Sequence, residues 1–283
     1  IAFIMFGVAL DIDLSILLRT WKQPKNLLLV VISQILLLPL CTLGLILLLN
    51  PSTGLAMGML LVACCPGGNV SNFYCQLASG NTELSISATT TSSLLSAIST
   101  PFIFGVFSTI IADQQSSNFD IPLTDMIKTI CWIIIIPTAL GIFIQQFLQR
   151  ERRMVQLIFK YASFFILTAF IAIALKNNFD HFLNYLGKVF LLVFLMNLLA
   201  FTLGLVIGKL TKMKKQDQVA MSMELGIQNS GLGLVLIFNF YDANGPMSFV
   251  AAWWGIWHIV AGFSFAIIYK RYLENKEWPS VES

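Results

Sequence analysis

The sequence predicts an all-α membrane protein, and three observations lead to that prediction. Of the 283 residues, 57% are hydrophobic and only 11% are charged, whereas a soluble globular domain has about 25% charged residues. Stretches such as 27–49 and 189–205 lack the polar face of a soluble helix. Basic residues cluster between the apolar stretches and the net charge is only +3. A lipid bilayer is therefore the expected surrounding, and a nucleic-acid partner is not indicated.

Nine segments are expected to lie in the membrane, separated by charged residues, Pro, Gly and short polar clusters. A helix needs about 20 residues to cross the hydrocarbon core, so the longest segments must tilt or break. The nine segments are 1–18, 24–49, 53–79, 83–112, 122–149, 154–175, 185–208, 216–241 and 246–271.

Positive charge gathers in alternate connections between these segments. Basic connections stay on the cytoplasmic side, so the chain is expected to start outside and to end with a cytoplasmic tail at 276–283. The basic residues that set this orientation are Arg19, Lys22, Lys25, Arg150, Arg152, Arg153, Lys209, Lys212, Lys214, Lys215, Lys270, Arg271 and Lys276.

Two segments are interrupted by polar or helix-breaking residues. The third segment contains CPGGNVSN at 65–72, and the eighth contains ELGIQNSG at 224–231. The two segments are five apart and so run in opposite directions, as inverted-topology repeats require. We expect one repeat over 1–113, an extracellular linker at 114–121 and a second repeat over 122–275. If each repeat has five helices, we expect the first helix to be either absent from this chain or missing in this protein.

Glu224 is the carboxylate expected deepest in the membrane. It follows Lys215 by nine residues, which puts it about 13 Å below the cytoplasmic edge. A charge at this depth costs roughly 2.5–3.5 kcal/mol, so the carboxylate should be paired, protonated or bound to a cation. The break that follows exposes carbonyls that suit Na⁺, while the next half-helix offers N–H groups to an anion. The alternative is a structural hydrogen bond within the bundle.

The first break has no carboxylate, but Asn69, Ser71 and Asn72 supply oxygen atoms. Its proline removes a hydrogen-bond donor, and its paired glycines tolerate any backbone dihedral. Ser85 and Thr89 share one helix face at i and i+4 and could complete a cation site. Such hydroxyls also line helix contacts in lipid and bond to their own i−4 carbonyls, so packing is the alternative.

Two isolated polar residues complete the set of candidates. Gln34 lies in an apolar span and could serve as an interhelical hydrogen-bonding residue. His258 lies in the last segment, and we treat it as a contact for a substrate instead of a proton relay.

Together, these motifs resemble the bile acid:sodium symporter family, over a range from 4 to 258. The resemblance implies ten helices in two inverted five-helix repeats, divided into a panel domain and a core domain in which two broken helices cross. Segment 1–18 would be the second helix of that fold. The matching motifs are IMFG at 4–7, Gln34 with Pro39, CPGG with SN at 65–72, Gly80-Asn81 with Ser85 and Thr89, and ELGIQNSGL at 224–232.

The resemblance also implies two Na⁺ ions and a substrate region. One ion would be held by Ser71, Asn72, Ser85, Thr89 and Glu224, and the other by Gln34, Glu224, Gln228 and the backbone carbonyls of Leu225 and Ile227. The substrate would lie near Asn69, Asn229, Ser230 and His258. The sequence departs from the family pattern at two positions, and both changes make the expected substrate region less polar. Ile259 stands where many bacterial relatives have asparagine, and Met196 replaces a histidine often found before Asn197.

The resulting expectation is sodium-coupled symport of an organic anion by alternating access, in a bacterial inner membrane. The anion would be bile acid-like or a small carboxylate such as pantoate or a keto acid. Proton-coupled or uncoupled transport, in which Glu224 titrates, is the alternative. An intramembrane enzyme is not expected, because HExxH, GxSxG and Asp-rich diphosphate motifs are absent from the sequence.

Overall fold

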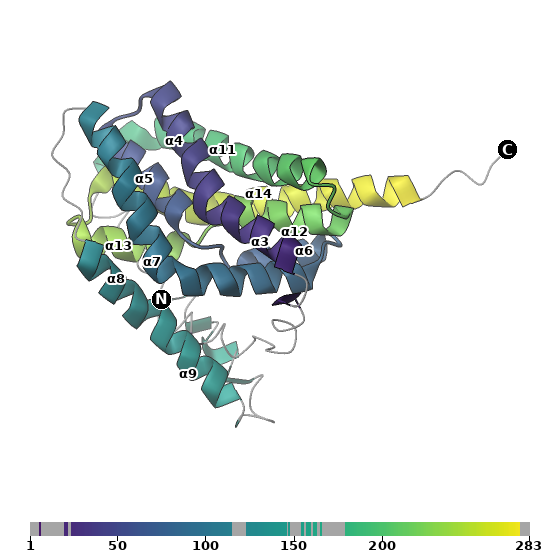
Figure 1. Ribbon diagram of the computed structural model, residues 1–283. Helices are drawn as coiled ribbons and strands as arrows, with labels where there is room; N and C mark the ends of the chain where they lie inside the picture. The colour runs from purple at the N-terminus through teal and green to yellow at the C-terminus, as the bar shows by residue number, and fades with distance from the viewer. Residues whose placement is uncertain are drawn as a thin grey trace.

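The computed structural model describes residues 24–114, 123–145 and 179–277, together with a few positions elsewhere. This part of the chain is helical, and its β-type pairing is limited to one isolated bridge between two loops (Figure 1). Most of the expected segments 1–18 and 154–175 and most of the linker 114–121 lie outside the described residues. The nine-span count and the repeat boundaries therefore remain predictions.

Five described helical stretches are long and apolar enough to cross a membrane, which confirms an integral membrane protein. They overlap the expected segments 24–49, 83–112, 122–149, 185–208 and 246–271. Their elements are α3 (Pro24–Ile32), η1 (Ser33–Leu37), α4 (Leu38–Leu49), α7 (Thr82–Gln114), α8 (Leu123–Ile130), η2 (Cys131–Ile135), α9 (Ile136–Gln145), α11 (Phe179–Leu210) and α14 (Gly245–Glu277).

Two of these spans contain a π-helical turn close to a proline. The turn η1 comes just before Pro39 and the turn η2 just before Pro137. A proline lacks the N–H of a regular helix and its ring crowds the carbonyl four residues earlier, and a wider turn accommodates both effects. The first of these turns carries Gln34 and buries its side chain.

The two interrupted segments are pairs of half-helices, as the sequence predicts. One pair is α5 (Thr53–Cys64) with α6 (Val70–Leu77), and the other is α12 (Lys215–Gly226) with α13 (Ser230–Phe240). The breaks meet in an antiparallel bridge between Gly67 and Gln228.

Hydrogen bonds across the bridge join the two breaks. The N–H of Gly68 donates to the carbonyl of Ile227 at 2.8 Å, and the N–H of Asn229 donates to the carbonyl of Pro66 at 2.8 Å. Backbone polar groups inside a membrane need partners within the protein. Each break therefore supplies hydrogen-bond partners for backbone N–H and carbonyl groups that the other break leaves unpaired.

Side chains of neighbouring spans bind the last carbonyls before each break. Thr100 Oγ1 of α7 donates to the carbonyl of Cys64 at 2.7 Å. Asn197 Nδ2 of α11 donates to the carbonyl of Gly226 at 2.7 Å. Helix C-termini leave carbonyls without intrahelical partners, so both residues stabilise the ends of α5 and α12.

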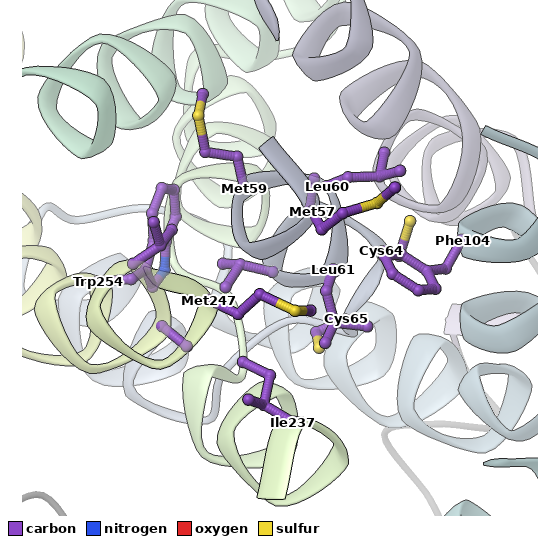
Figure 2. Close-up of a cluster of buried hydrophobic side chains, with 14 of the residues drawn as sticks. Met57, Met59, Leu60, Leu61, Cys64, Cys65, Phe104, Ile237, Met247 and Trp254 are labelled. Atoms are coloured by element: carbon purple, nitrogen blue, oxygen red, sulfur yellow. The ribbon is translucent and has the colours of Figure 1, made fainter. Parts of the chain in front are cut away.

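The half-helix α5 forms the centre of the apolar core. Every residue from 55 to 64 is buried, and α5 packs on α4, α7, α13 and α14. Gly58 allows α14 to approach, because a Cβ there would come within 2.9 Å of Met247 Cα. Figure 2 shows side chains of α5 and of the following Cys65 within this core. They are Met57, Met59, Leu60, Leu61, Cys64 and Cys65, which lie among Phe104, Ile237, Met247 and Trp254.

Asn197→Leu should destabilise the protein, because it leaves the buried carbonyl of Gly226 without its donor. The expected loss is roughly 1–3 kcal/mol of unfolding free energy, measured as a lower melting temperature of the purified protein in detergent. The matched control is Asn239→Leu, since Asn239 is exposed and bonds only within its own helix. Equal melting temperatures for the two variants would contradict this role of Asn197.

Candidate functional site

The site is built around Glu224, which lies near the end of α12 and is 0% exposed. Its Oε2 accepts a hydrogen bond from Ser71 Oγ of α6 at 2.9 Å and another from Thr89 Oγ1 of α7 at 2.8 Å. Within the described part of the chain no lysine, arginine or histidine forms an ion pair with this carboxylate. Hydroxyl groups, not a basic side chain, are therefore its neighbours.

All five residues of the first predicted sodium set lie in one cluster. Ser85 Oγ donates to Asn72 Oδ1 at 2.7 Å, and Thr89 Oγ1 lies 3.3 Å from the same oxygen. Ser71 Oγ and Thr89 Oγ1 are 3.4 Å apart. These contacts gather carboxylate, amide and hydroxyl oxygens from α6, α7 and α12, the kind of group that hard cations prefer.

The cluster contains more acceptors than protons to fill them. Thr89 Oγ1 lies within hydrogen-bonding distance of Glu224 Oε2, Asn72 Oδ1 and the carbonyl of Ser85, the last at 3.0 Å. A hydroxyl has one proton to donate, so it can satisfy only one of these three oxygens at a time. Thr89 Oγ1 therefore lies close both to the i−4 carbonyl expected from packing and to Glu224, and its one proton can be given to only one of them.

The second predicted set is also brought together at the break of α12. Gln34 Nε2 donates to Gln228 Oε1 at 3.3 Å, which joins η1 to the loop. Gln228 Nε2 in turn faces the carbonyls of Glu224 and Leu225 at 3.3 and 2.8 Å. The carbonyl of Ile227 accepts the bridge hydrogen bond from Gly68. Gln34 therefore makes an interhelical hydrogen bond and belongs to the same site as Glu224.

Two buried oxygens of this site have no hydrogen-bond partner, namely Glu224 Oε1 and Gln34 Oε1. An unsatisfied buried acceptor costs about 1–3 kcal/mol, and more when it is charged. When Glu224 is ionised both atoms can only accept. A bound cation is one kind of partner that such oxygens can take.

Gly67 brings the first break close to this carboxylate. A Cβ at this position would overlap Glu224 Oε1 and lie 3.0 Å from Gln34 Nε2. Neither Gly67 nor Gly68 uses the positive φ that a glycine tolerates. Space for Glu224 and Gln34 is what requires a glycine at position 67.

The predicted substrate residues are only partly brought together. Asn69 and Asn229 immediately precede α6 and α13, and Asn229 Oδ1 caps α13 by accepting from the N–H of Leu232 at 3.0 Å. Ser230 is buried against Gly255 of α14, where a Cβ would lie 2.9 Å from its Oγ. His258 is 8% exposed and lies three residues beyond Gly255. Among the described residues no hydrogen bond joins it to the other three.

Asp217 is a second buried carboxylate that the sequence analysis did not single out. It lies in the first turn of α12 and is 6% exposed. Its spacing of seven residues from Glu224, about two helical turns, was the signal available in the sequence.

Comparison with known proteins gives a consistent result. Residues 1–185 match the family described as the sodium bile acid symporter family. A relative from Bacillus subtilis (strain 168), named an uncharacterized sodium-dependent transporter YocS, is 28% identical over 100% of this chain and 85% of its own length.

More distant relatives carry related names. The sodium-dependent organic anion transporter of Bos taurus is 25% identical, over 98% of this chain and 74% of its own length. The probable sodium/metabolite cotransporter BASS1, chloroplastic, of Arabidopsis thaliana is 25% identical, over 94% of this chain and 65% of its own length. These names point to transporters and not to enzymes.

Gly67→Ala should displace the Glu224 carboxylate or separate the two breaks, because the added methyl occupies the position of Glu224 Oε1. The unfolding free energy should fall by roughly 1–3 kcal/mol, measured by thermal unfolding in detergent. Gly233→Ala is the control, since the nearest side-chain atoms there lie 3.7 Å from the added carbon. A Gly67→Ala variant as stable as this control would contradict the described geometry.

Proposed function

Because the chain belongs to the sodium bile acid symporter family, we propose that it is a secondary transporter that couples sodium movement to uptake of an organic anion. The observation that carries this proposal is the buried Glu224 carboxylate, whose Oε2 contacts a hydroxyl cluster while its Oε1 has no partner. A buried carboxylate without a basic partner is offset most directly by a bound cation.

Two sodium ions are proposed to share Glu224. The first would take oxygens of Ser71, Asn72, Ser85, Thr89 and Glu224, and the second those of Gln34, Glu224, Gln228 and the carbonyls of Leu225 and Ile227. The division of contacts supports this assignment, because Oε2 contacts the hydroxyl cluster whereas Oε1 has no hydrogen-bond partner. A single carboxylate can thus present one oxygen to each ion.

The same arrangement suggests how sodium assists substrate binding. The first set links α6, α7 and α12, and the second links η1 to the break between α12 and α13. Filling both sets would more than balance the single charge of Glu224 and hold these elements together, so that the starts of α6 and α13 are fixed before the substrate arrives. Alternating access would follow from movement of a core domain against a panel domain in an inverted-repeat fold.

The substrate is proposed to be an organic anion, bile acid-like or a small carboxylate such as pantoate or a keto acid. Half-helix N-termini attract negative charge, and α6 and α13 both begin next to the bridged breaks. Asn69, Asn229, Ser230 and His258 are the proposed contacts. We propose that the protein lies in a bacterial inner membrane with its C-terminus in the cytoplasm.

Proton coupling is the second candidate, because an unpartnered carboxylate oxygen can also carry a proton. A proton carrier would be driven by a pH gradient in the absence of sodium. A sodium carrier would be driven by a sodium gradient at constant pH.

Glu224→Gln should abolish both sodium-driven uptake into proteoliposomes and sodium-dependent thermal stabilisation, because the amide lacks the charge that balances a cation. Glu83→Gln is the matched control, since Glu83 is an exposed carboxylate at the start of α7. Sodium-driven uptake that persists in the Glu224→Gln variant would exclude the proposed sites. Wild-type uptake that follows pH and ignores sodium would favour the proton mechanism.

Organic anions that are substrates should raise the melting temperature more in sodium chloride than in potassium chloride at equal ionic strength. Sodium and anion bind the folded protein cooperatively in a symporter, and a ligand stabilises the state to which it binds. The measurement is a thermal-shift screen of bile acids, pantoate and keto acids in both salts. Equal stabilisation in the two salts would argue for uncoupled transport.

A further inference from the structure

Asp217 makes two short hydrogen bonds with amides from two other parts of the fold. Its Oδ1 accepts from Asn81 Nδ2 at 2.6 Å, and its Oδ2 accepts from Asn26 Nδ2 at 2.9 Å. Asn26 belongs to α3, and Asn81 directly precedes α7. With both oxygens occupied by amides, Asp217 connects helices and has no part in the proposed ion sites.

Asn81 docks the corner between α6 and α7 onto the start of α12. Its Oδ1 caps α7 by accepting from the N–H of Leu84 at 3.1 Å, while its own N–H donates to the carbonyl of Gln216 at 2.9 Å. Gly80 allows this close approach, because a Cβ there would lie 2.7 Å from Val219 Cγ1. The corner therefore has little freedom to move along α12.

Polar residues around Asp217 and Glu224 form two tiers along α12 and two neighbouring spans. The Asp217 tier comprises Asn26, Asn81 and Asp217. The Glu224 tier comprises Glu224, its partner Thr89, and Gln34, which is linked to Glu224 through Gln228. Seven residues separate the two carboxylates, or about 10.5 Å and two turns, so both lie on one face of α12.

The spacing on the partner spans is close to this distance. Eight residues separate Asn81 from Thr89, and eight separate Asn26 from Gln34, about 12 Å in a regular α-helix. The tiers are therefore about two turns apart on each of the three spans. A shift of α12 at the Asp217 tier would move Glu224 relative to Thr89 and Gln34.

We propose that Asp217 is a positioning residue for sodium binding, which fixes the height of α12 so that Glu224 faces its oxygen partners. The inference rests on the proposed function, because it requires Glu224 to bind sodium. Hydrogen bonds between a carboxylate and amides are directional, and an acidic residue in the first turn of a helix is favoured by the helix dipole. Ion ligands need their geometry held within about 0.5 Å.

The test measures the sodium concentration that half-saturates binding of radioactive sodium, in purified wild-type protein and in Asp217→Asn. We expect half-saturation to rise by roughly tenfold in the variant, the scale of a lost hydrogen bond to a charged group. A general loss of stability lowers the melting temperature but leaves half-saturation of the folded protein unchanged. This readout thus separates positioning from stability alone.

A double variant, Asn81→Asp with Asp217→Asn, exchanges the two partners and restores one carboxylate–amide pair between the same elements. Aspartate also caps helices well, so α7 keeps its N-cap. We expect the exchange to return half-saturation close to the wild-type value.

Asn26→Ala removes only one of the two amides and should give a smaller rise in half-saturation. It serves as the test if Asp217→Asn does not fold. Asp125→Asn is the control, because Asp125 is exposed and pairs with Lys128 at 3.2 Å.

The possible results distinguish this inference from the proposed function. A raised half-saturation that the exchange reverses supports the positioning role. Unchanged half-saturation in Asp217→Asn, or in Asn26→Ala where only that variant folds, overturns this role and leaves sodium coupling in place. A wild-type protein that binds no sodium at any concentration overturns both.

Discussion

The fold of the described residues depends on the hydrogen-bonded contact between two broken helices. Separately, the loops after α5 and α12 would leave several backbone groups unsatisfied inside an apolar bundle, at a cost of several kcal/mol each. The bridge between Gly67 and Gln228 removes much of that cost, and Thr100 and Asn197 satisfy carbonyls at the two ends. The contact also brings together polar residues that lie more than 150 positions apart in the chain.

The contact in turn explains where the buried charge lies. Gly67 leaves room for the Glu224 carboxylate, whose Oε2 is held by hydroxyls while Oε1 has no partner. A fixed basic partner at this point would neutralise the site permanently. Hydroxyls, amides and carbonyls leave the negative charge available to a cation that can bind and leave again, which is what coupling to an ion gradient requires.

Much of this arrangement could be predicted from the sequence because its signals are local. Apolar length indicated the spans, Pro-Gly and Gly-x-Gln-Asn patterns indicated the breaks, and Glu224 was conspicuous as a carboxylate in an apolar environment. Both sodium sets came from the family resemblance, and the structure brings their side chains together. The inverted repeats stay a prediction, because much of the relevant chain lies outside the described residues. The role of Gly67 and the contacts of Asp217 depend on distant residues, and one sequence does not contain that pairing information.

Sharing of Glu224 by two sodium ions can be tested by binding of radioactive sodium to the purified protein. We expect saturable binding of two ions per chain at constant pH, displaced by unlabelled sodium but not by potassium. We also expect both ions to be lost together when Glu224 is replaced by glutamine, because each uses one of its oxygens. Binding of a single ion, or two-ion binding that survives this substitution, would contradict the sharing of Glu224.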